Sequence, residues 1–405
     1  MPSEQVGRRI GTVMQKLPPL PTVVQKLLAV MRDENSSADD VTRVLKADQA
    51  LAGKILRLVN SSYYGLAGEV STVSRAVVIL GFSGIRNVAL GLGTMEALGA
   101  MGSGSKAEEF WEHSLAAAAA GQCVAQHCKA TIDPEEVFVA SLLHDVGQLV
   151  LSAAVPDDYA AVLDGTGELV VREKERLGVS HDQVAYKLLQ HWRLPEALCE
   201  AARCHHNLQV AAGGSQLLTT CVALGDALAC VHGGAYEPPA GEAALGRLAA
   251  ALELERSDLF AVLDGMEATI ERTKTFLQVA GREAPRPAGS GGGEGVVVLS
   301  GDPDRSEWAT GLLTRFGQQI VPPRDFFARS AGCDSVRLVL VDPQCVTRAQ
   351  LGKILPFLDA SGIPVVILAA DDPAAVAPDL RDRYPVVGYV FSRAEIARLM
   401  QVQLA

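Results

Sequence analysis

The stretch from Ser141 to Val150, SLLHDVGQLV, places two ionisable side chains inside an otherwise apolar run. His144 and Asp145 are adjacent there, and apolar residues both precede and follow them. A helix that is apolar on every side belongs in the interior of a protein. A carboxylate in that interior must be paired, hydrogen-bonded or bound to a cation. The stretch therefore predicts one of two arrangements, a His–Asp pair that caps or bridges neighbouring helices, or a metal site.

A change of composition after residue 280 divides the chain of 405 residues. Residues 283–295, EAPRPAGSGGGEG, have the Pro, Gly and Ser content of a flexible linker. Short runs rich in β-branched residues follow, with helical segments between them, which predicts a small α/β domain with a buried parallel sheet. The predicted divisions are an N-terminal helical lobe at 1–98, a second helical lobe at 107–280, a linker at 281–295 and an α/β domain at 296–405.

The N-terminal lobe has apolar residues at helical spacing, as in TVVQKLLAVMRD at 22–33 and DQALAGKILRLVN at 48–60. Ser36 and Ser37, with acidic residues after them, supply capping groups for the helix between these two. Residues 71–93 predict two further helices, AVVILG and FSGIRNVALGLG, which meet at Gly81. Residues 99–107, GAMGSGSKA, then predict a flexible break before the second lobe.

The net charge of −11 weighs against non-specific binding to nucleic acid or to an anionic membrane. The N-terminus lacks the apolar segment of a signal peptide, and no uncharged apolar stretch reaches the length of about 18 residues that a membrane span needs. The eight cysteines form no Cys-x-x-Cys pair, and most lie in apolar helical segments. This context is typical of reduced, buried thiols. We therefore expect a cytoplasmic protein that binds neither membrane nor nucleic acid directly.

The second lobe concentrates histidines and carboxylates on predicted helices or at their ends. Glu109 and His113 are four residues apart and so share one helix face. Imidazole together with carboxylate suits iron, manganese or zinc better than calcium. An Asp can also bridge two ions that lie about 3.5–4 Å apart. The candidate ligands for one or two ions are Glu109, His113, His144, Asp145, His181, His205, His206 and Asp226.

Each candidate ligand also has a purely structural interpretation. Asp226 can pair with an arginine, and His181 can simply begin a helix after Ser180. His205 and His206 can be exposed at the end of a helix. The remaining histidines are interpreted as structural or surface residues, namely His127, His191 and His232.

Four segments, taken in order and spacing, resemble HDOD domains, the helical output modules of bacterial signalling proteins. They are LPPLPTVVQKLL, DQALAGKILRLVNSSYYG, STVSRAVVILGFSGIRNVAL and SLLHDVGQLV. The resemblance covers about residues 10–280. It implies an all-α module that binds a partner or ligand and passes on a signal.

The order His, His-Asp, His, His-His, Asp also resembles the metal-dependent phosphohydrolases of the HD superfamily, above all the branch that cleaves cyclic dinucleotides. The resemblance assigns the primary ligands of a metal ion to His113, His144, Asp145 and Asp226. It assigns the additional ligands of the dinuclear branch to Glu109, His181, His205 and His206.

Two departures from that branch bear on activity. A lysine that helps to position phosphate stands three residues after the His-Asp pair in the branch, and here Gln148 takes its place. The Gly-Tyr-Pro signature of the branch is replaced by HHNLQVAAGG at 205–214. The resemblance therefore implies metal binding more than turnover, and it assigns no catalytic residue.

The C-terminal part, from GVVVLSGDPDRSEWATGLLTRFG onward, resembles a response-regulator receiver domain, with Asp342 at the phospho-acceptor position. Phosphoryl transfer there needs an acidic pair for magnesium, a hydroxyl group and a lysine. The corresponding positions hold Ser300 and Gly301, Ala369 and Ser392. Mg²⁺ and phosphate then lack their partners, so Asp342 is expected to end a strand rather than to accept phosphate. The domain is interpreted as a pseudo-receiver for protein interaction or homodimerisation.

The whole sequence thus predicts a bacterial signal-transduction protein, an all-α HDOD module followed by a degenerate receiver-like (flavodoxin-like) domain. Its expected partner is a signalling protein or a small nucleotide. The alternative is a metal-dependent HD-type phosphohydrolase acting on a phosphodiester such as a cyclic dinucleotide. Gln148 favours the regulatory interpretation, and the full set of metal ligands favours the enzyme.

Overall fold

The computed structural model describes residues 3–33, 35–60, 69–99, 105–165, 167–210, 213–233, 241–277, 295–323, 336–344, 348–369 and 376–392, with Phe326, Val346, residues 394–396 and Arg398. The predicted linker at 281–295, except Gly295, lies outside these ranges, and so do residues 100–104 of the predicted break at 99–107.

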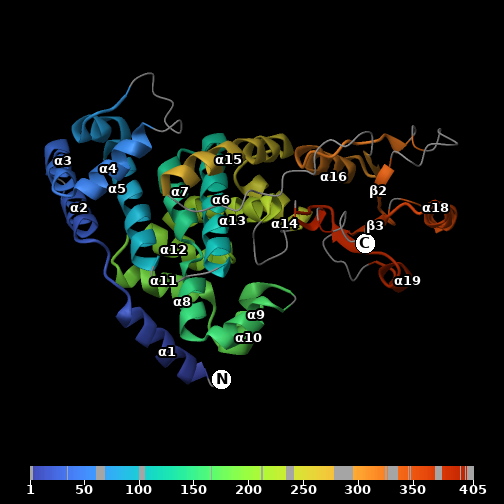
Figure 1. Cartoon of the computed structure of the whole chain (residues 1–405), viewed down its shortest axis with the longest axis horizontal. Coiled ribbons are helices and arrows are strands. Elements are labelled where there is room, and N and C mark those ends of the chain that lie inside the picture. The colour runs from blue at the N-terminus through green and yellow to red at the C-terminus, as the bar shows by residue number, and fades with distance from the viewer. Residues whose placement is uncertain are drawn as a thin grey trace. The chain divides into compact units, whose positions relative to one another are not determined.

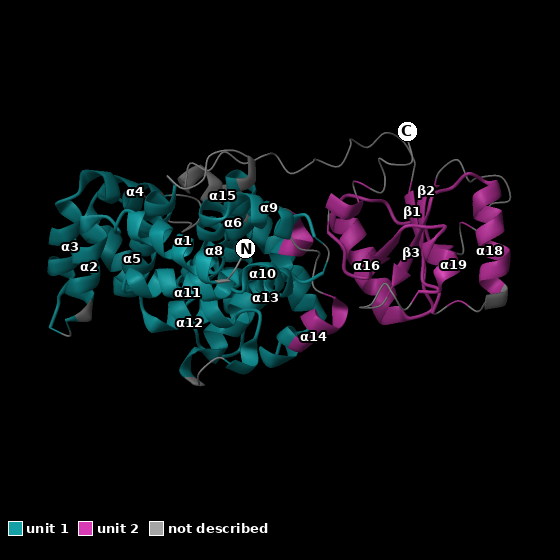
Figure 2. Cartoon of the chain, turned by 90° about the horizontal axis from the view of Figure 1, so that it is seen from below, with its two compact units in different colours: residues 1–229, 234–237, 248–281 teal, residues 230–233, 238–247, 282–405 magenta. Residues whose placement is uncertain are grey.

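The chain forms two compact units (Figure 2). The helical unit comprises residues 1–229, 234–237 and 248–281, and the α/β unit comprises residues 230–233, 238–247 and 282–405. Each unit is described by itself below.

The described residues of the N-terminal part of the helical unit form five helices (Figure 1). Those at Thr22–Arg32, Ala38–Lys46 and Gln49–Val59 were predicted, whereas the helix at Ser3–Lys16 was not predicted individually, and the two helices predicted over 71–93 form one kinked helix. Ser37 caps α3, and the side chain of Asp40 accepts a hydrogen bond from the Ser37 N–H in return. Gly81 has φ 66° and ψ −177°, which kinks α5 at the point where the sequence predicted a break between two helices. The helices are α1 (Ser3–Lys16), α2 (Thr22–Arg32), α3 (Ala38–Lys46), α4 (Gln49–Val59) and α5 (Val73–Leu98).

The described residues between 105 and 277 form ten more α-helices, with two single 3₁₀ turns at Leu208–Val210 and Gly213–Ser215. They are α6 (Ser105–His127), α7 (Pro134–Leu143), α8 (Val146–Ala154), α9 (Pro156–Leu163), α10 (Leu169–Leu177), α11 (His181–His191), α12 (Glu196–Cys204), α13 (Gln216–His232), α14 (Glu242–Ala251) and α15 (Arg256–Leu277).

Two segments, Val73–Leu98 and Pro134–Ala154, are long and apolar enough to cross a membrane by length and composition alone. Within the structure, however, 61% and 83% of their most apolar windows are buried. Both segments therefore serve as core helices of the helical unit, and their apolar character is explained by packing.

The His144–Asp145 pair interrupts the apolar run instead of continuing a helix, which differs from the single buried helix that we expected. Helix α7 ends at Leu143 and α8 begins at Val146. Gly147 packs against α11 so closely that a Cβ atom there would lie 2.0 Å from the carbonyl oxygen of His181. The turn directs α8 onto α11, and glycine permits the contact because it has no side chain.

Helices α6 and α13 also meet at glycine. A Cβ atom on Gly225 would lie 2.7 Å from Cα of Gly121 and 2.9 Å from the carbonyl oxygen of Ala117. The alanines at 116–120 of α6 are buried as well. Small residues on both helices let the two backbones approach each other, which brings the ligand-bearing parts of α6 and α13 together.

The α/β unit contains the predicted buried parallel sheet, with strand order β1-β2-β3-β4. Ile320 adds an isolated parallel bridge to Val296 of β1. Leu299 pairs with Val341, so the residues that follow β1 and β2, Ser300 and Asp342, lie side by side. The strands are β1 (Gly295–Leu299), β2 (Val336–Val341), β3 (Val365–Ala369) and β4 (Val386–Gly388), and the helices are α16 (Pro303–Arg315), α18 (Arg348–Ala360) and α19 (Pro378–Arg381).

Candidate metal centre

Seven of the eight predicted metal ligands converge inside the helical unit. They come from separate elements: α6, the turn between α7 and α8, the first residue of α11, the residues after α12, and α13. All are buried or nearly so except His206, which is exposed. The converging residues are His113, His144, Asp145, His181, His205, His206 and Asp226.

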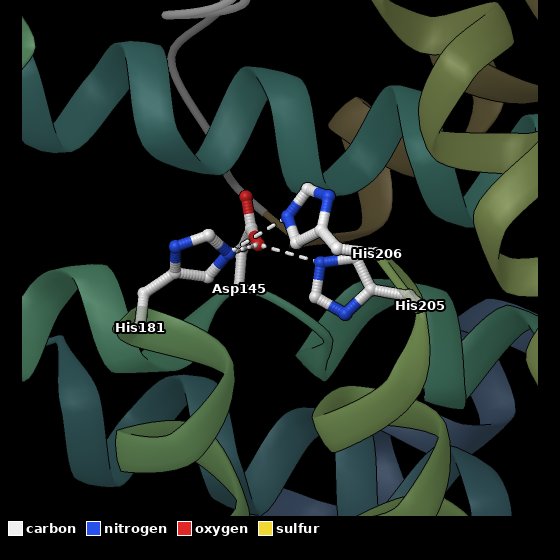
Figure 3. A group of neighbouring side chains, drawn as sticks. All are labelled: Asp145, His181, His205 and His206. Atoms are coloured by element: carbon white, nitrogen blue, oxygen red, sulfur yellow. Dashed lines mark hydrogen bonds and ion pairs between the residues drawn. The ribbon is translucent and has the colours of Figure 1, made fainter. Parts of the chain in front are cut away.

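Asp145 lies at the middle of this cluster, and Figure 3 shows three of the histidines around it. Its Oδ1 is 3.1 Å from Nε2 of His181 and 3.5 Å from Nε2 of both His144 and His205. Its Oδ2 is 3.8 Å from Nε2 of His113. One carboxylate therefore faces four imidazoles.

Asp226 supplies a second carboxylate. Its Oδ1 is 3.0 Å from Nε2 of His113 and 3.5 Å from Nε2 of His144. We call His113, His144, Asp145 and Asp226 the first ligand group, and Asp145, His181, His205 and His206 the second ligand group. Asp145 is common to both.

Backbone carbonyls fix the orientation of two histidines. Nδ1 of His144 donates to the carbonyl oxygen of Ser141 at 2.6 Å, and Nδ1 of His205 donates to that of Ala202 at 2.8 Å. Both carbonyls belong to the last turn of a helix, α7 or α12, where they have no partner within the helix. Because Nδ1 is used in these bonds, Nε2 of each ring is directed at the carboxylates, and it is the nitrogen that a metal ion would bind after displacing any proton there.

His181 is oriented by a carboxylate instead. Its Nδ1 donates to Oε2 of Glu173 at 2.8 Å, and its backbone N–H donates to the same oxygen at 2.8 Å. The Tyr159 hydroxyl donates to Oε1 of Glu173 at 2.9 Å. Glu173 was not among the ligands predicted from the sequence. A usable signal was present, since Glu173 stands four residues from both Leu169 and Leu177, on the buried stripe of α10.

The charges of the cluster depend on one another. Burial by itself disfavours the charged form of His144, but Asp145 and Asp226 outweigh burial and raise its pKa to about 9. Burial likewise opposes protonation of His181, yet Glu173 and Asp145 hold its pKa well above the usual value. Burial opposes ionisation of Asp145 and Asp226 too, but the neighbouring imidazoles keep the pKa of both carboxyls well below normal. The site therefore concentrates negative charge that attracts a cation, either a proton or a metal ion.

The donor set fits a metal ion. Among the described residues, Nε2 of His144, Nε2 of His205 and Oδ1 of Asp145 are buried without a hydrogen-bond partner. Buried polar atoms are normally satisfied, and these three point at one another. Imidazole nitrogen with carboxylate oxygen suits a transition metal. The second ligand group is placed to hold a metal ion, and so are His113, His144 and Asp145 of the first.

The other residues that the sequence singled out lie around or away from this cluster. Glu109 is half-buried on α6 and belongs to neither ligand group within the described part of the chain. Gln148 is buried, and its Nε2 donates to Oδ2 of Asp145 at 2.6 Å. His127 and His191 are exposed, as expected of surface histidines.

One curated protein is similar to part of this chain. An uncharacterized protein of Treponema pallidum is 25% identical over 214 residues, which span 50% of this chain and 41% of that protein. The match thus covers less than half of the relative's length.

Solved structures resemble the fold of the helical part. An HDOD domain protein of unknown function from Geobacter sulfurreducens superposes with a TM-score of 0.53 at 21% identity, over 67% of this chain and 98% of that chain. A Shewanella amazonensis protein provisionally named a phosphohydrolase superposes with a TM-score of 0.53 at 23% identity, over 66% of this chain and 98% of that one. A Marinobacter aquaeolei protein provisionally named a signal transduction protein superposes with a TM-score of 0.52 at 24% identity, over 69% of this chain and 65% of that one.

The match to the HDOD family covers the segment that contains most of the candidate ligands. Its family model matches residues 17–208, a range that runs from the N-terminal lobe to just beyond His206. Residues 17–208 therefore form an HDOD domain.

Proposed function

We propose that this protein is a bacterial signalling regulator whose HDOD module is a metal-bound binding or output domain. The observation that carries the proposal is the hydrogen bond from Gln148 to Asp145, 2.6 Å long. Stabilising the charge that develops on phosphoryl oxygens requires fixed cations. Gln148 stands where the related hydrolases have a lysine, and its amide orients a metal ligand instead. The site is thus equipped to hold an ion, with less provision for phosphate.

The bound metal is proposed to be iron, manganese or zinc. His113, His144, Asp145 and Asp226 would hold one ion, and His181, His205 and His206 would share Asp145 to hold a second. When bound, an ion supplies Lewis acidity and a cross-link between helices. The protein contributes the tautomers that direct Nε2 inward and the burial that keeps water from competing.

The second candidate function is a metal-dependent phosphohydrolase acting on a phosphodiester such as a cyclic dinucleotide. Asp145 supports it, because one carboxylate that belongs to both ligand groups can bridge two ions, as two-metal hydrolases require. The provisional phosphohydrolase name of the Shewanella protein points the same way for that protein.

Elemental analysis of the purified full chain, prepared aerobically and anaerobically, tests the metal proposal. We expect one or two equivalents of a transition metal in the wild type and in His191→Ala, a matched exposed histidine. We expect a large loss in His144→Ala and Asp226→Ala. Less than about a tenth of an equivalent in the wild type, with no effect of either substitution, would refute metal binding.

We also propose that the α/β unit is a degenerate receiver that serves protein interaction, including homodimerisation. With the bridge at Ile320 counted as a rudimentary strand, the strand order becomes 2-1-3-4-5, the flavodoxin-like order. Asp342 then stands at the end of the central strand. The side chain of Asp302, the one acidic residue near the expected acidic pair, accepts hydrogen bonds from backbone N–H groups at the start of α16.

We further propose that the protein is located in the cytoplasm and that its partner is a signalling protein or a small nucleotide. The net charge of −11 supports a partner other than free nucleic acid or an anionic membrane.

A further inference from the structure

A buried hydrogen-bonded chain leads from α9 and α10 into the second ligand group. Tyr159 donates to one oxygen of Glu173, and the other oxygen accepts from both Nδ1 and the backbone N–H of His181. Tyr159, Glu173 and His181 are each at most 1% exposed. Burying a carboxylate is costly unless it is paired and hydrogen-bonded. The three donors to this single buried carboxylate therefore satisfy it, and they hold it in a fixed orientation against His181.

The two ligand groups differ in charge. The first contains two carboxylates, Asp145 and Asp226, whereas the second has only the shared Asp145 with three imidazoles, which are uncharged when they bind a metal ion. A divalent ion in the second group would be the less well neutralised of the two. A carboxylate one hydrogen bond away from a ligand can supply the missing charge, because it raises the basicity of the imidazole to which it is bonded.

Glu173 is the carboxylate in that position. His144 and His205 donate their Nδ1 protons to neutral backbone carbonyls, whereas His181 donates to Glu173. With Nδ1 bonded to Glu173, Nε2 is the ring nitrogen of His181 left for a metal ion, and it lies 3.1 Å from Asp145 Oδ1 and 3.1 Å from Nε2 of His206. Two ring nitrogens and an oxygen at such distances are held together either by a shared proton or by a metal ion.

We propose that Glu173 is the positioning residue that enables the second ligand group to hold a metal ion. It sets the tautomer of His181, aims Nε2 of that ring at Asp145, and supplies the negative charge that the group lacks. Tyr159 holds Glu173 in place from α9. This inference rests on the proposed function, namely that the cluster binds metal, and it adds which outer residue decides the occupancy of the second position.

The test is titration of the metal-free full chain with Co²⁺, followed by absorption and by competition with a chelator. We expect two ions to bind the wild type. Glu173→Gln keeps the size and one acceptor oxygen but removes the charge. It should leave the affinity for the first ion unchanged and weaken that for the second by about 10- to 100-fold. Tyr159→Phe should weaken the binding of the second ion by a smaller factor than Glu173→Gln does.

Two further variants serve as controls. Asp158→Asn removes a partly exposed ion pair with Arg176, 3.1 Å long, between the same two helices, and it should leave both affinities unchanged. Asp226→Asn should show the converse of Glu173→Gln, with the first ion weakened and the second retained. Nitrogen NMR of ¹⁵N-histidine-labelled, metal-free protein provides a readout without metal. The Nδ1–H signal of His181, whose proton is bonded to Glu173, should shift in Glu173→Gln and stay in place in Asp158→Asn.

The outcomes separate the inference from the proposed function. Equal binding of both ions by wild type and Glu173→Gln overturns the role of Glu173 while leaving the metal site intact. If Glu173→Gln weakens the binding of both ions equally, the role of Glu173 is also overturned, since that result indicates a general structural effect. A wild type that binds a single ion overturns the inference as well, and one that binds none refutes the proposed function together with it. If Glu173→Gln does not fold, Tyr159→Phe decides, and unchanged affinity for the second ion there contradicts the proposal.

Discussion

The side-chain amide of Gln148 lies 2.6 Å from Oδ2 of Asp145 and donates a hydrogen bond to it. Both residues are buried, and Gln148 follows the His-Asp pair by three positions on the first turn of α8. The amide therefore orients the one carboxylate that both ligand groups share.

Cyclic-dinucleotide hydrolysis is expected to be negligible, with Mn²⁺ or Fe²⁺ loaded under reducing conditions. Gln148→Lys should not create an efficient enzyme, because one added cation does not supply the remaining contacts to a substrate. The measurement is product formation by wild type, Gln148→Lys and His144→Ala. Turnover of about 1 per second in the wild type, absent from His144→Ala, lies within the usual enzyme range and would favour the phosphohydrolase interpretation.

Gly147→Ala is expected to destabilise the helical unit by about 3 kcal/mol or more, since the added methyl group would overlap the carbonyl of His181 on α11. Gly11→Ala is the matched control. It lies inside α1 with open space around it, so it should stabilise the protein by about 0.5–1 kcal/mol. Urea unfolding of both variants gives the comparison. A Gly147→Ala protein as stable as the wild type would contradict the close packing of α8 on α11.

The stability of the metal-free protein is expected to fall as the pH rises from about 6.5 to about 9. The pKa of His144 is raised to about 9 in the folded state, against about 6.5 in the unfolded chain. Its stabilising contribution is therefore complete below the unfolded value and is lost as the pH passes through the folded one. Chelator-treated wild type and His144→Gln should be unfolded with urea across this range. A decline of equal size in both proteins would show that His144 does not cause it.

Metal loading should change this dependence, because an ion must displace the protons that the cluster holds. His144 and His181 both have raised pKa values, so binding at neutral pH should release protons. Calorimetry in two buffers of different ionisation enthalpy measures that release. Identical apparent enthalpies in the two buffers would contradict it.

Asp342 is expected not to accept a phosphoryl group. It is completely buried, its Oδ2 accepts a hydrogen bond from Ser300 at 3.1 Å, and a guanidinium nitrogen of Arg305 lies 4.0 Å from the same oxygen. Incubation with acetyl phosphate and Mg²⁺, followed by intact-mass measurement, should show no added phosphate. A stoichiometric adduct that disappears in Asp342→Asn would prove this prediction wrong.

Local features of the structure could be read from the sequence because they depend on neighbouring residues. The capping of α3 by Ser37, the kink at Gly81 and the buried parallel strands of the α/β unit follow from side-chain chemistry within a few positions. The motifs of the HDOD domain were likewise recognisable from order and spacing. The requirement that Asp145 find a partner also follows from the apolar run around it.

The partner of each buried polar group was decided only by tertiary structure. The turn at His144 and Asp145 accompanies the close contact between Gly147 and α11, which no local pattern contains. From the sequence, Gln148 occupies the position where related hydrolases contact phosphate, but in the structure its amide donates a hydrogen bond to Asp145. Glu173 reaches His181 because α10 packs beside α11. A pattern of residue types shows which groups need a charge or hydrogen bond, whereas the approach of distant helices determines which residue provides it.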